Sequence, residues 1–271
     1  MNYKDKICLG TANFGNNYAG LNGLNLNESR DLFDHFIDSG FSRVDTASGY
    51  GKALSYLLQM DSLSQLTEIT TKISFNEPSE QVFETCCQEV QELFEVCEGI
   101  VSVLSHDPCL TPLGRNRYER FVDKFNRIYK SIGVSIYNIQ DIEEANYLIE
   151  KVQFPASFVE GGKTQDIRSL AEKNYNISIR SIFLRGILFD GEYFKYLNKT
   201  DANQVYECMG GLTNNSDIHE KALNFVCGLD AVSEVVIGAK NKNEIDVMSL
   251  NTDCYNEFLP ENSLRIDMRS L

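Results

Sequence analysis

Four ionisable side chains of this sequence could act together on a carbonyl group. Asp45 and Tyr50 stand five residues apart in "RVDTASGYG", and Lys72 and His106 follow further along the chain. A phenol has a pKa of about 10 and exchanges its proton poorly near neutral pH, but a neighbouring ammonium favours the phenolate and lowers that pKa. A carboxylate would hold the ammonium charged and in place, and an imidazole would donate a hydrogen bond to the same substrate oxygen. Such a set can polarise a carbonyl while hydride arrives from another group, or remove the proton of an alcohol.

Each of the four residues also has a structural interpretation. Asp45 could cap a turn, and Tyr50 could pack in the core. Lys72 could extend its ammonium to solvent, and His106, which precedes an Asp-Pro pair, could belong to a turn. All four occur in succession where predicted strands end, and this joint occurrence favours the catalytic interpretation.

The elements that would position these residues alternate between strands and helices. Eight short β-rich runs are separated by stretches with apolar residues three and four positions apart. The runs are "KICLGTA", "FSRVDTA", "LTEITTKIS", "GIVSVLS", "SIGVSIY", "KVQFPAS", "ISIRSIFL" and "SEVVIGA". Nearly continuous apolar runs are typical of parallel strands, so we predict an α/β fold, a single (β/α)8 TIM barrel formed by residues 1–271, whose strand ends converge on one mouth. A doubly wound open sheet is the alternative, but the glycines of "LGTANFGNNYAG" lack the G-x-G-x-x-G spacing typical of a dinucleotide-binding sheet.

Three helices and one long connection are also predicted. "ESRDLFDHFIDSG" should end at Gly40 and bury one face, formed by Leu32, Phe33, Phe36 and Ile37. "EQVFETCCQEVQELFEV" should bury Val82, Phe83, Val90 and Phe94. Asn138 is the predicted N-cap of a helix that contains Asp141. The long connection 185–214 is expected to cover the mouth with its aromatic residues Tyr193, Phe194, Tyr196 and Tyr206.

Composition restricts the function classes. A net charge of −14 disfavours nucleic acid and anionic membrane partners, so an anionic substrate would need a local basic patch. No signal-like segment and no apolar stretch of membrane-spanning length occurs. Eight cysteines without a C-x-x-C pair predict reduced thiols in a cytoplasmic protein. The three histidines are scattered, which argues against a metal-dependent hydrolase, and no metal site is predicted.

The segments around the four ionisable residues resemble the aldo/keto reductase superfamily, in a short, bacterial-type form. The family landmarks "DTA…YG", "TK" and "LxH" stand here as "DTASGYG", "TTKIS" and "VLSHDP", in the same order. The resemblance implies a barrel that uses NAD(P)H to reduce a small carbonyl substrate. It implies Tyr50 as the general acid/base, Lys72 and Asp45 as its tuning pair, and His106 as the residue that orients the substrate.

The resemblance extends over nearly the whole chain and implies a set of cofactor-binding residues. Lys240 and Asn241 would contact the adenosine 2′-phosphate, which favours NADP (NADPH) over NAD, and Ser135 and Gln153 would hold the nicotinamide carboxamide. A lysine where a helix follows a barrel strand can also meet a phosphate on physical grounds alone. The implied set is Gly10, Thr11, Ala12, Ser135, Gln153, Ser181, Phe183, Leu184, Gly186, Gly238, Lys240, Asn241 and Glu244.

Other positions depart from the family pattern or lie beside the mouth. Ile136 and Met248 stand where the family has asparagine, and Ala53 and Leu54 replace a serine and a glutamate. These changes leave open an alternative, an aldo/keto reductase-like binding or regulatory protein with weak or no redox turnover. The patterns "LGTAxFG" and "RSxFLxG" resemble a bacterial branch encoded beside surface-sugar biosynthesis enzymes, which suggests a sugar carbonyl. Further candidates for phosphate contacts are Arg180 and Arg185, whereas Lys163 is expected at the solvated surface.

Overall fold

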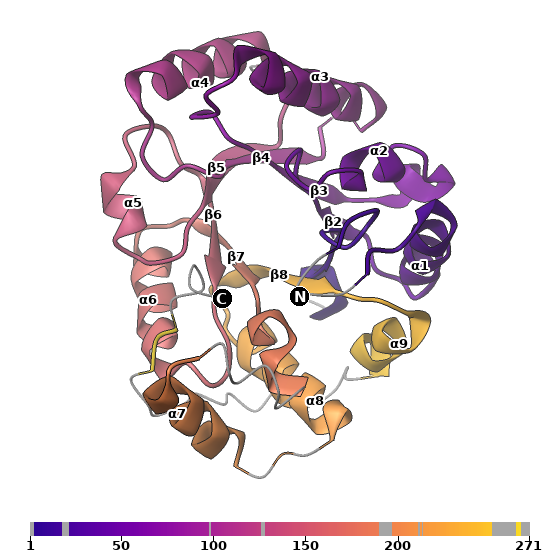
Figure 1. Ribbon diagram of the computed structural model, residues 1–271, viewed down its shortest axis with the longest axis vertical. Coiled ribbons are helices and arrows are strands. Elements are labelled where there is room, and N and C mark those ends of the chain that lie inside the picture. The colour runs from indigo at the N-terminus through magenta and orange to yellow at the C-terminus, as the bar shows by residue number, and fades with distance from the viewer. Residues whose placement is uncertain are drawn as a thin grey trace.

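Eight parallel strands close into a barrel in the order β1 to β8, and β8 pairs with β1 (Figure 1). The computed structural model describes residues 3–17, 22–97, 99–125, 128–189, 197–210, 212, 214–250 and 264–266. The strands are β1 (Ile7–Gly10), β2 (Arg43–Asp45), β3 (Glu68–Ile73), β4 (Val101–Ser105), β5 (Ser131–Ser135), β6 (Lys151–Pro155), β7 (Asn176–Arg180) and β8 (Val232–Gly238). The predicted (β/α)8 architecture is therefore confirmed.

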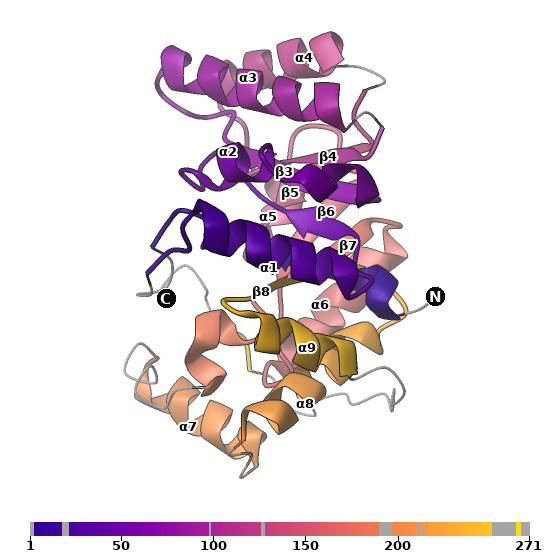
Figure 2. The ribbon, with the colours of Figure 1, turned by 90° about the vertical axis from the view of Figure 1, so that its right-hand side faces the viewer.

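Helices surround this barrel on the outside (Figures 1 and 2). They are α1 (Leu26–Asp38), α2 (Ala53–Leu57), α3 (Glu80–Val96), α4 (Pro112–Phe125), α5 (Asp141–Glu144), α6 (Gly161–Glu172), α7 (Lys199–Met209), α8 (Asn215–Cys227) and α9 (Lys242–Leu250). Short 3-10 helices are η1 (Tyr3–Lys6), η2 (Asp61–Gln65) and η3 (Leu184–Phe189). Both views place α3 beside α4 at one end of the molecule and α7 beside α8 at the other.

Helix α1 forms as its sequence predicts. Asn25 caps its first turn in a capping box with Glu28. The predicted apolar face is buried, with Phe33 and Phe36 at 0% exposure. Gly40 follows the helix with a φ of +86°, a left-handed conformation that glycine adopts without a steric penalty.

Two details of the other predicted helices are wrong. In α3, Phe83, Val90 and Phe94 are buried, but Val82 is 47% exposed because it lies about 100° around the helix from Phe83. Helix α5 contains only four residues, and Gln140 rather than Asn138 precedes it. The Asp141 carboxylate instead accepts hydrogen bonds from the backbone N–H groups of residues 137 and 138, which stabilises the loop in place of a longer helix.

The long connection after β7 contains the eleven-residue helix α7, which the sequence did not predict. Tyr206 lies on α7 and is 74% exposed, so its ring faces solvent. Tyr193, Phe194 and Tyr196 lie outside the described residues. The predicted lid therefore gains no support from the one aromatic residue of the set that the structure describes.

Lys163 is buried, which corrects its expected place at the solvated surface. It is 1% exposed on α6, donates to the Tyr137 carbonyl at 3.1 Å and lies 4.7 Å above the Phe154 ring. Residues 264–266 cross the start of this helix, where the Ile266 N–H donates to Glu160 at 2.8 Å. Burial is the main cause that raises the pKa of the Glu160 carboxyl, to about 7. A buried acid thus anchors the segment 264–266.

We expect Glu160→Gln to stabilise the protein at pH 8 but not at pH 4.5. A carboxyl whose pKa is raised by folding favours the folded state when protonated, and this advantage is lost as pH rises from about 4.5 through about 7. The amide keeps the acceptor for Ile266 without the buried charge, so the gain at pH 8 should be about 3 kcal/mol. Urea unfolding at both pH values measures it, with exposed Glu143→Gln as the control. A gain of equal size at both pH values would contradict the expectation.

The remaining sequence expectations concern cysteines, metals and membranes. Seven cysteines are described, all are free thiols, and Cys8, Cys87, Cys97 and Cys227 are buried. Within the described ranges, no group of three or more His, Cys, Asp or Glu side chains is arranged to hold a metal ion. The same part of the chain contains no helix with the length and apolar character needed to cross a bilayer.

Candidate active site

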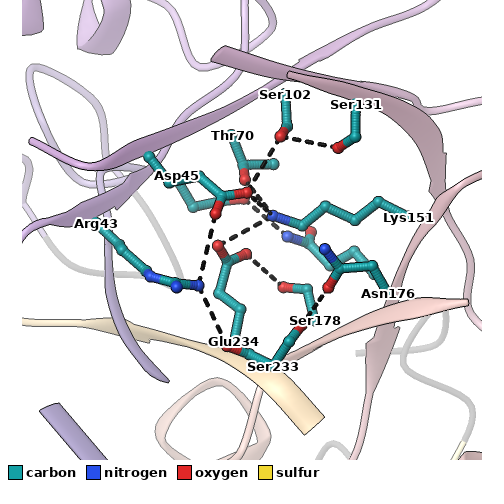
Figure 3. Close-up of polar contacts among 12 residues, drawn as sticks. Arg43, Asp45, Thr70, Ser102, Ser131, Lys151, Asn176, Ser178, Ser233 and Glu234 are labelled. Atoms are coloured by element: carbon teal, nitrogen blue, oxygen red, sulfur yellow. Dashed lines mark hydrogen bonds and ion pairs between the residues drawn. The ribbon is translucent and has the colours of Figure 1, made fainter. Parts of the chain in front are cut away.

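Side chains from distant strands meet inside the barrel. Gln153 of β6 donates to Asp45 of β2 at 2.7 Å, and Lys151 of β6 contacts Glu68 of β3 and Glu234 of β8. These strand pairs are not neighbours in the sheet, so the contacts cross the interior (Figure 3). Alternate residues of a strand face the same side, so Lys151 and Gln153 belong to two successive inward layers. The lower layer lies toward the amino ends of the strands, and the upper layer lies toward the mouth.

The lower layer is a buried ion cluster, which we call the barrel floor and define as Glu68, Lys151 and Glu234. The Lys151 ammonium lies 2.8 Å from a Glu68 oxygen and 3.0 Å from a Glu234 oxygen, and all three residues are at most 3% exposed. Burial alone would raise the pKa of Glu68, but Lys151 and Lys130 outweigh it and lower that pKa to about 2. Burial opposes the charge of Lys151 as well, yet the two carboxylates raise its pKa. Glu68 and Lys151 are therefore held ionised.

The barrel floor was not anticipated from the sequence, where these strands were interpreted as nearly continuous apolar runs. Bulky branched residues dominate the interior of most barrels of this architecture. The available signal was the position of the charges. Glu68 stands four residues before Lys72, and Lys151 stands two residues before Gln153. With a period of two, these residues face the same side of their strands as the polar residues near the strand ends.

In the upper layer, Asp45 and Lys72 form a buried ion pair. The Lys72 ammonium lies 2.5 Å from an Asp45 oxygen and 3.1 Å from the Thr46 carbonyl oxygen. The two residues are 2% and 1% exposed. Burial alone would lower the pKa of Lys72, but Asp45 and then Tyr50 outweigh it and raise that pKa above its ordinary value. The ammonium is therefore charged at neutral pH.

Tyr50 and His106 lie above this pair at the mouth. Tyr50 is half-buried in the loop after β2, and its ring centroid is 5.3 Å from the Lys72 nitrogen. His106 follows β4 and is held by a backbone hydrogen bond to Ile73, with its side chain exposed in the mouth. Desolvation of the imidazole by the surrounding protein, and then the charge of Lys72, lower the pKa of His106 to about 4. The four predicted catalytic residues therefore gather at one place, with the imidazole neutral near pH 7.

The first and last strands present small residues at the same mouth. Gly10 pairs with Gly238 in the β1–β8 register, and a Cβ atom at Gly238 would have no heavy atom within 4 Å. Thr11 is buried, and its backbone N–H and its hydroxyl both donate to the Asp45 carbonyl. Ala12 is half-buried directly beyond it. This edge of the mouth leaves open space beside the end of β8.

Ser135 and Gln153 are register partners on β5 and β6, and both are buried. The Gln153 side-chain nitrogen donates to Asp45, whereas its oxygen is buried without a hydrogen-bond partner. A buried acceptor of this kind costs about 1–3 kcal/mol unless a donor reaches it. The N–H₂ of a carboxamide is such a donor, so Gln153 fits the group that it is predicted to hold.

The turn after β7 has an unusual backbone. Ser181 and Leu184 have φ values of +60° and +49°, and Gly186 has a φ of +95°. Non-glycine residues in this region cost on the order of 1 kcal/mol each and are often found at ligand-binding sites. The Leu184 side chain is buried in the core, and the Phe183 ring packs against Phe189 at 4.9 Å, so these two side chains also have structural roles.

The residues predicted to bind the 2′-phosphate surround the start of α9. Asn241 accepts a hydrogen bond from the Glu244 N–H at 3.1 Å, and a Glu244 oxygen accepts from the Lys240 N–H at 2.9 Å. The Lys240 side chain is exposed. The site therefore combines a free lysine with backbone donors, one of which is occupied by Glu244.

The residues that depart from the family pattern are core residues. Ile136, Ala53, Leu54 and Met248 are each at most 1% exposed. Their apolar side chains pack where the family pattern would place polar ones, so they supply no hydrogen bond to a ligand.

Comparison with known proteins agrees with this architecture. The sequence profile described as "Aldo/keto reductase family" matches residues 6–250. An aldo-keto reductase from Klebsiella pneumoniae in complex with NADPH is 14% identical, with a TM-score of 0.66 over 97% of this chain and 94% of that one. A holo-form aldo-keto reductase from Bacillus halodurans is 16% identical, with a TM-score of 0.65 over 92% of this chain and 87% of that one. No protein with a curated description matches the sequence. With the profile covering most of its length, the chain belongs to the aldo/keto reductase family.

Proposed function

We propose that the protein is an NADPH-dependent oxidoreductase that reduces a small aldehyde, ketone or sugar carbonyl. The observation that carries the proposal is the buried Asp45–Lys72 pair directly beside Tyr50, with His106 at the same mouth. The sugar carbonyl is supported by the "LGTAxFG" and "RSxFLxG" patterns alone, and so is a role in bacterial surface-sugar biosynthesis.

In the proposed mechanism the four residues act on the carbonyl oxygen. The Tyr50 hydroxyl gives its proton to that oxygen, and the Lys72 ammonium stabilises the phenolate that remains. Asp45 keeps Lys72 charged and fixed, and Gln153 in turn fixes Asp45. The neutral His106 donates a hydrogen bond that orients the substrate and shares the charge that develops on its oxygen. When bound, NADPH supplies the hydride.

The residues present fit this cofactor. The unpartnered Gln153 oxygen and the nearby Ser135 hydroxyl suit the carboxamide, and Gly238 leaves room at the mouth. Lys240 and the backbone at the start of α9 suit a phosphate. Structures similar to this chain were solved with NADPH and with NADP. These observations support NADPH as the cofactor.

Two measurements test the proposal. Calorimetry should show one molecule of NADPH bound per chain, and mixing with an aldehyde panel should consume NADPH, followed by its absorbance. Absence of any nicotinamide binding would refute the proposal. Tight binding without consumption would favour a second candidate, a binding or regulatory protein, for which the apolar Ile136 and Leu54 are the specific observation.

Lys240→Ala should weaken NADPH binding by about tenfold and leave NADH binding within about twofold. Lys240 is the exposed cation next to the first backbone donors of α9, and only NADPH carries the 2′-phosphate that would contact it. Fluorescence titration gives both dissociation constants. Lys242→Ala is the matched control, because it removes an exposed lysine two residues away. An equal loss of affinity for NADPH and NADH would show that Lys240 does not contact the 2′-phosphate.

A further inference from the structure

Arg180 is a cation of the mouth that the proposed mechanism leaves without a role. It is the last residue of β7 and pairs in register with Pro155 at the end of β6, which places it at the carboxyl ends of the strands. This is the same edge of the barrel at which Lys72 and His106 lie. Its charge acts on both of these groups.

The contacts of Arg180 hold the guanidinium in place without neutralising it. One terminal nitrogen donates to the Ile136 carbonyl at 3.0 Å, and the other makes a long contact of 3.4 Å to the Ser181 hydroxyl. The guanidinium carbon lies 4.6 Å from the centroid of the Tyr137 ring. Among the described residues no carboxylate forms an ion pair with Arg180, although ion pairs of eight other cationic residues occur there.

The basic groups that lie nearest to Arg180 have different surroundings. Lys72 is paired with Asp45 at 2.5 Å, and the buried Lys163 experiences the opposite charges of Glu160 and Asp166. His106 is neutral at neutral pH because its pKa is about 4. Arg180 is therefore a cation of the mouth without an ion-pair partner among the described residues, although the whole chain has a net charge of −14. In such a chain a fixed, half-buried cation marks a place where a negative group is accepted.

A guanidinium has five N–H donors in a planar fork that matches carboxylate and phosphate oxygens. The two contacts above leave further N–H groups of Arg180 without a hydrogen-bond partner among the described residues, and Arg180 is half-buried at the end of β7. We infer that Arg180 binds an anionic group, a carboxylate or a phosphate, on the carbonyl substrate whose oxygen faces Tyr50 and His106. The inference rests on the proposed function and narrows its substrate class to anionic carbonyl compounds.

The test compares matched substrates that differ in one charge. The pairs are 4-formylbenzoate with its methyl ester, for a carboxylate, and glyceraldehyde 3-phosphate with glyceraldehyde, for a phosphate. The wild-type protein should prefer the anionic member of at least one pair in kcat/KM. Arg180→Gln should reduce that preference by about tenfold to hundredfold, and Arg180→Lys should reduce it less, because an ammonium keeps the charge but loses the fork. The effect should appear mainly in KM.

Controls separate the anion site from folding and from cofactor binding. Arg115→Gln on α4 removes the same charge from an exposed position and should leave the preference unchanged. Thermal unfolding shows whether the Arg180→Gln protein is folded. If it is not, the comparison is made with Arg180→Lys instead. The inference is overturned if Arg180→Gln reduces the preference for the anionic substrate by less than about fivefold, or if the wild type shows no such preference. A raised NADPH dissociation constant in that case would assign Arg180 to the cofactor.

Binding without turnover keeps the two proposals distinguishable. Terephthalate carries a second carboxylate in place of the aldehyde of 4-formylbenzoate, and inorganic phosphate probes the other class of anion. Calorimetry should show that one of these binds the wild type at least about tenfold more tightly than Arg180→Gln. If no aldehyde is reduced but this difference persists, the proposed function fails and the anion site stands. Equal binding by both proteins would overturn the anion site.

Discussion

Replacing Tyr50 with phenylalanine should lower kcat for aldehyde reduction by about 10²- to 10⁴-fold, while the NADPH dissociation constant stays within about twofold. The change removes a single hydroxyl, the one that we propose as proton donor to the carbonyl oxygen. The ring still packs in the loop after β2, beside a Lys72 that keeps its Asp45 partner at 2.5 Å. The binding groups for the cofactor are untouched, so the loss should lie in the chemical step.

Single-turnover kinetics with NADPH and an aldehyde measure this step directly, and fluorescence titration measures cofactor binding. The matched control is Tyr206→Phe, which removes a hydroxyl from a tyrosine that is 74% exposed on α7 and should leave kcat within about twofold. A Tyr50→Phe protein that reduces aldehydes at the wild-type rate would exclude Tyr50 as the donor. The proton donor would then have to be another group at the mouth.

Replacing Lys151 with methionine should reduce the free energy of unfolding by about 3–5 kcal/mol. Lys151 is the cation that lies between Glu68 and Glu234, both almost inaccessible to solvent. Without it, two carboxylates face each other in the barrel interior, and one of them must take up a proton or remain buried with an unpaired charge. Urea denaturation at pH 7 measures the loss.

Lys130→Met is the matched control for this prediction. Lys130 also contacts Glu68 at 2.8 Å, but its side chain is 40% exposed, so its loss should cost less than about 1 kcal/mol. The triple change Lys151→Met, Glu68→Gln and Glu234→Gln should recover much of the stability, because no charge of the barrel floor is then left buried. If Lys151→Met and Lys130→Met reduced the free energy of unfolding equally, the contribution of Lys151 could not be explained by its burial.

The pH dependence of the same variants follows from the pKa of Glu68. Its pKa of about 2 in the folded protein lies below the ordinary value of 4.5, so its contribution to stability is present above pH 4.5 and is lost as pH falls toward 2. In Lys151→Met the carboxylates are more stable when protonated. The difference in unfolding free energy between wild type and variant should therefore shrink between pH 5 and pH 3, and a constant difference would contradict the assigned pKa.

The sequence was sufficient to predict the barrel and the place where four polar residues meet. Parallel strands deliver their carboxyl ends to one edge, so Asp45, Lys72 and His106 could be grouped from strand boundaries alone. Their contacts were not derivable, because the 2.5 Å pair and the orienting bond from Gln153 depend on packing between strands far apart in the chain. The alternation of strand residues could have predicted that Glu68 faces the interior. Its β-branched neighbours instead favoured the interpretation of the segment as an apolar strand.

Local patterns failed where a side chain had two possible partners. Asp141 could extend a helix or accept hydrogen bonds from the loop before it, and the loop prevailed. Lysine is a residue type usually found at the surface, yet Lys163 is buried, where it contacts the Tyr137 carbonyl and the Phe154 ring. Arg180 was recognised as basic and near the rim. Its lack of a carboxylate partner among the described residues could be seen only once the neighbours were placed.

The barrel floor also makes the two halves of the chain depend on each other. Lys151 is separated from Glu68 and from Glu234 by 83 residues in each direction, so a fragment that ends after β4 would hold Glu68 without its buried counterion. The first half would also present Asp45 without Gln153, its partner from β6. Neither half should persist as a folded unit by itself. A newly made chain must then reach β8 before its interior charges are all matched, and the same event completes the mouth.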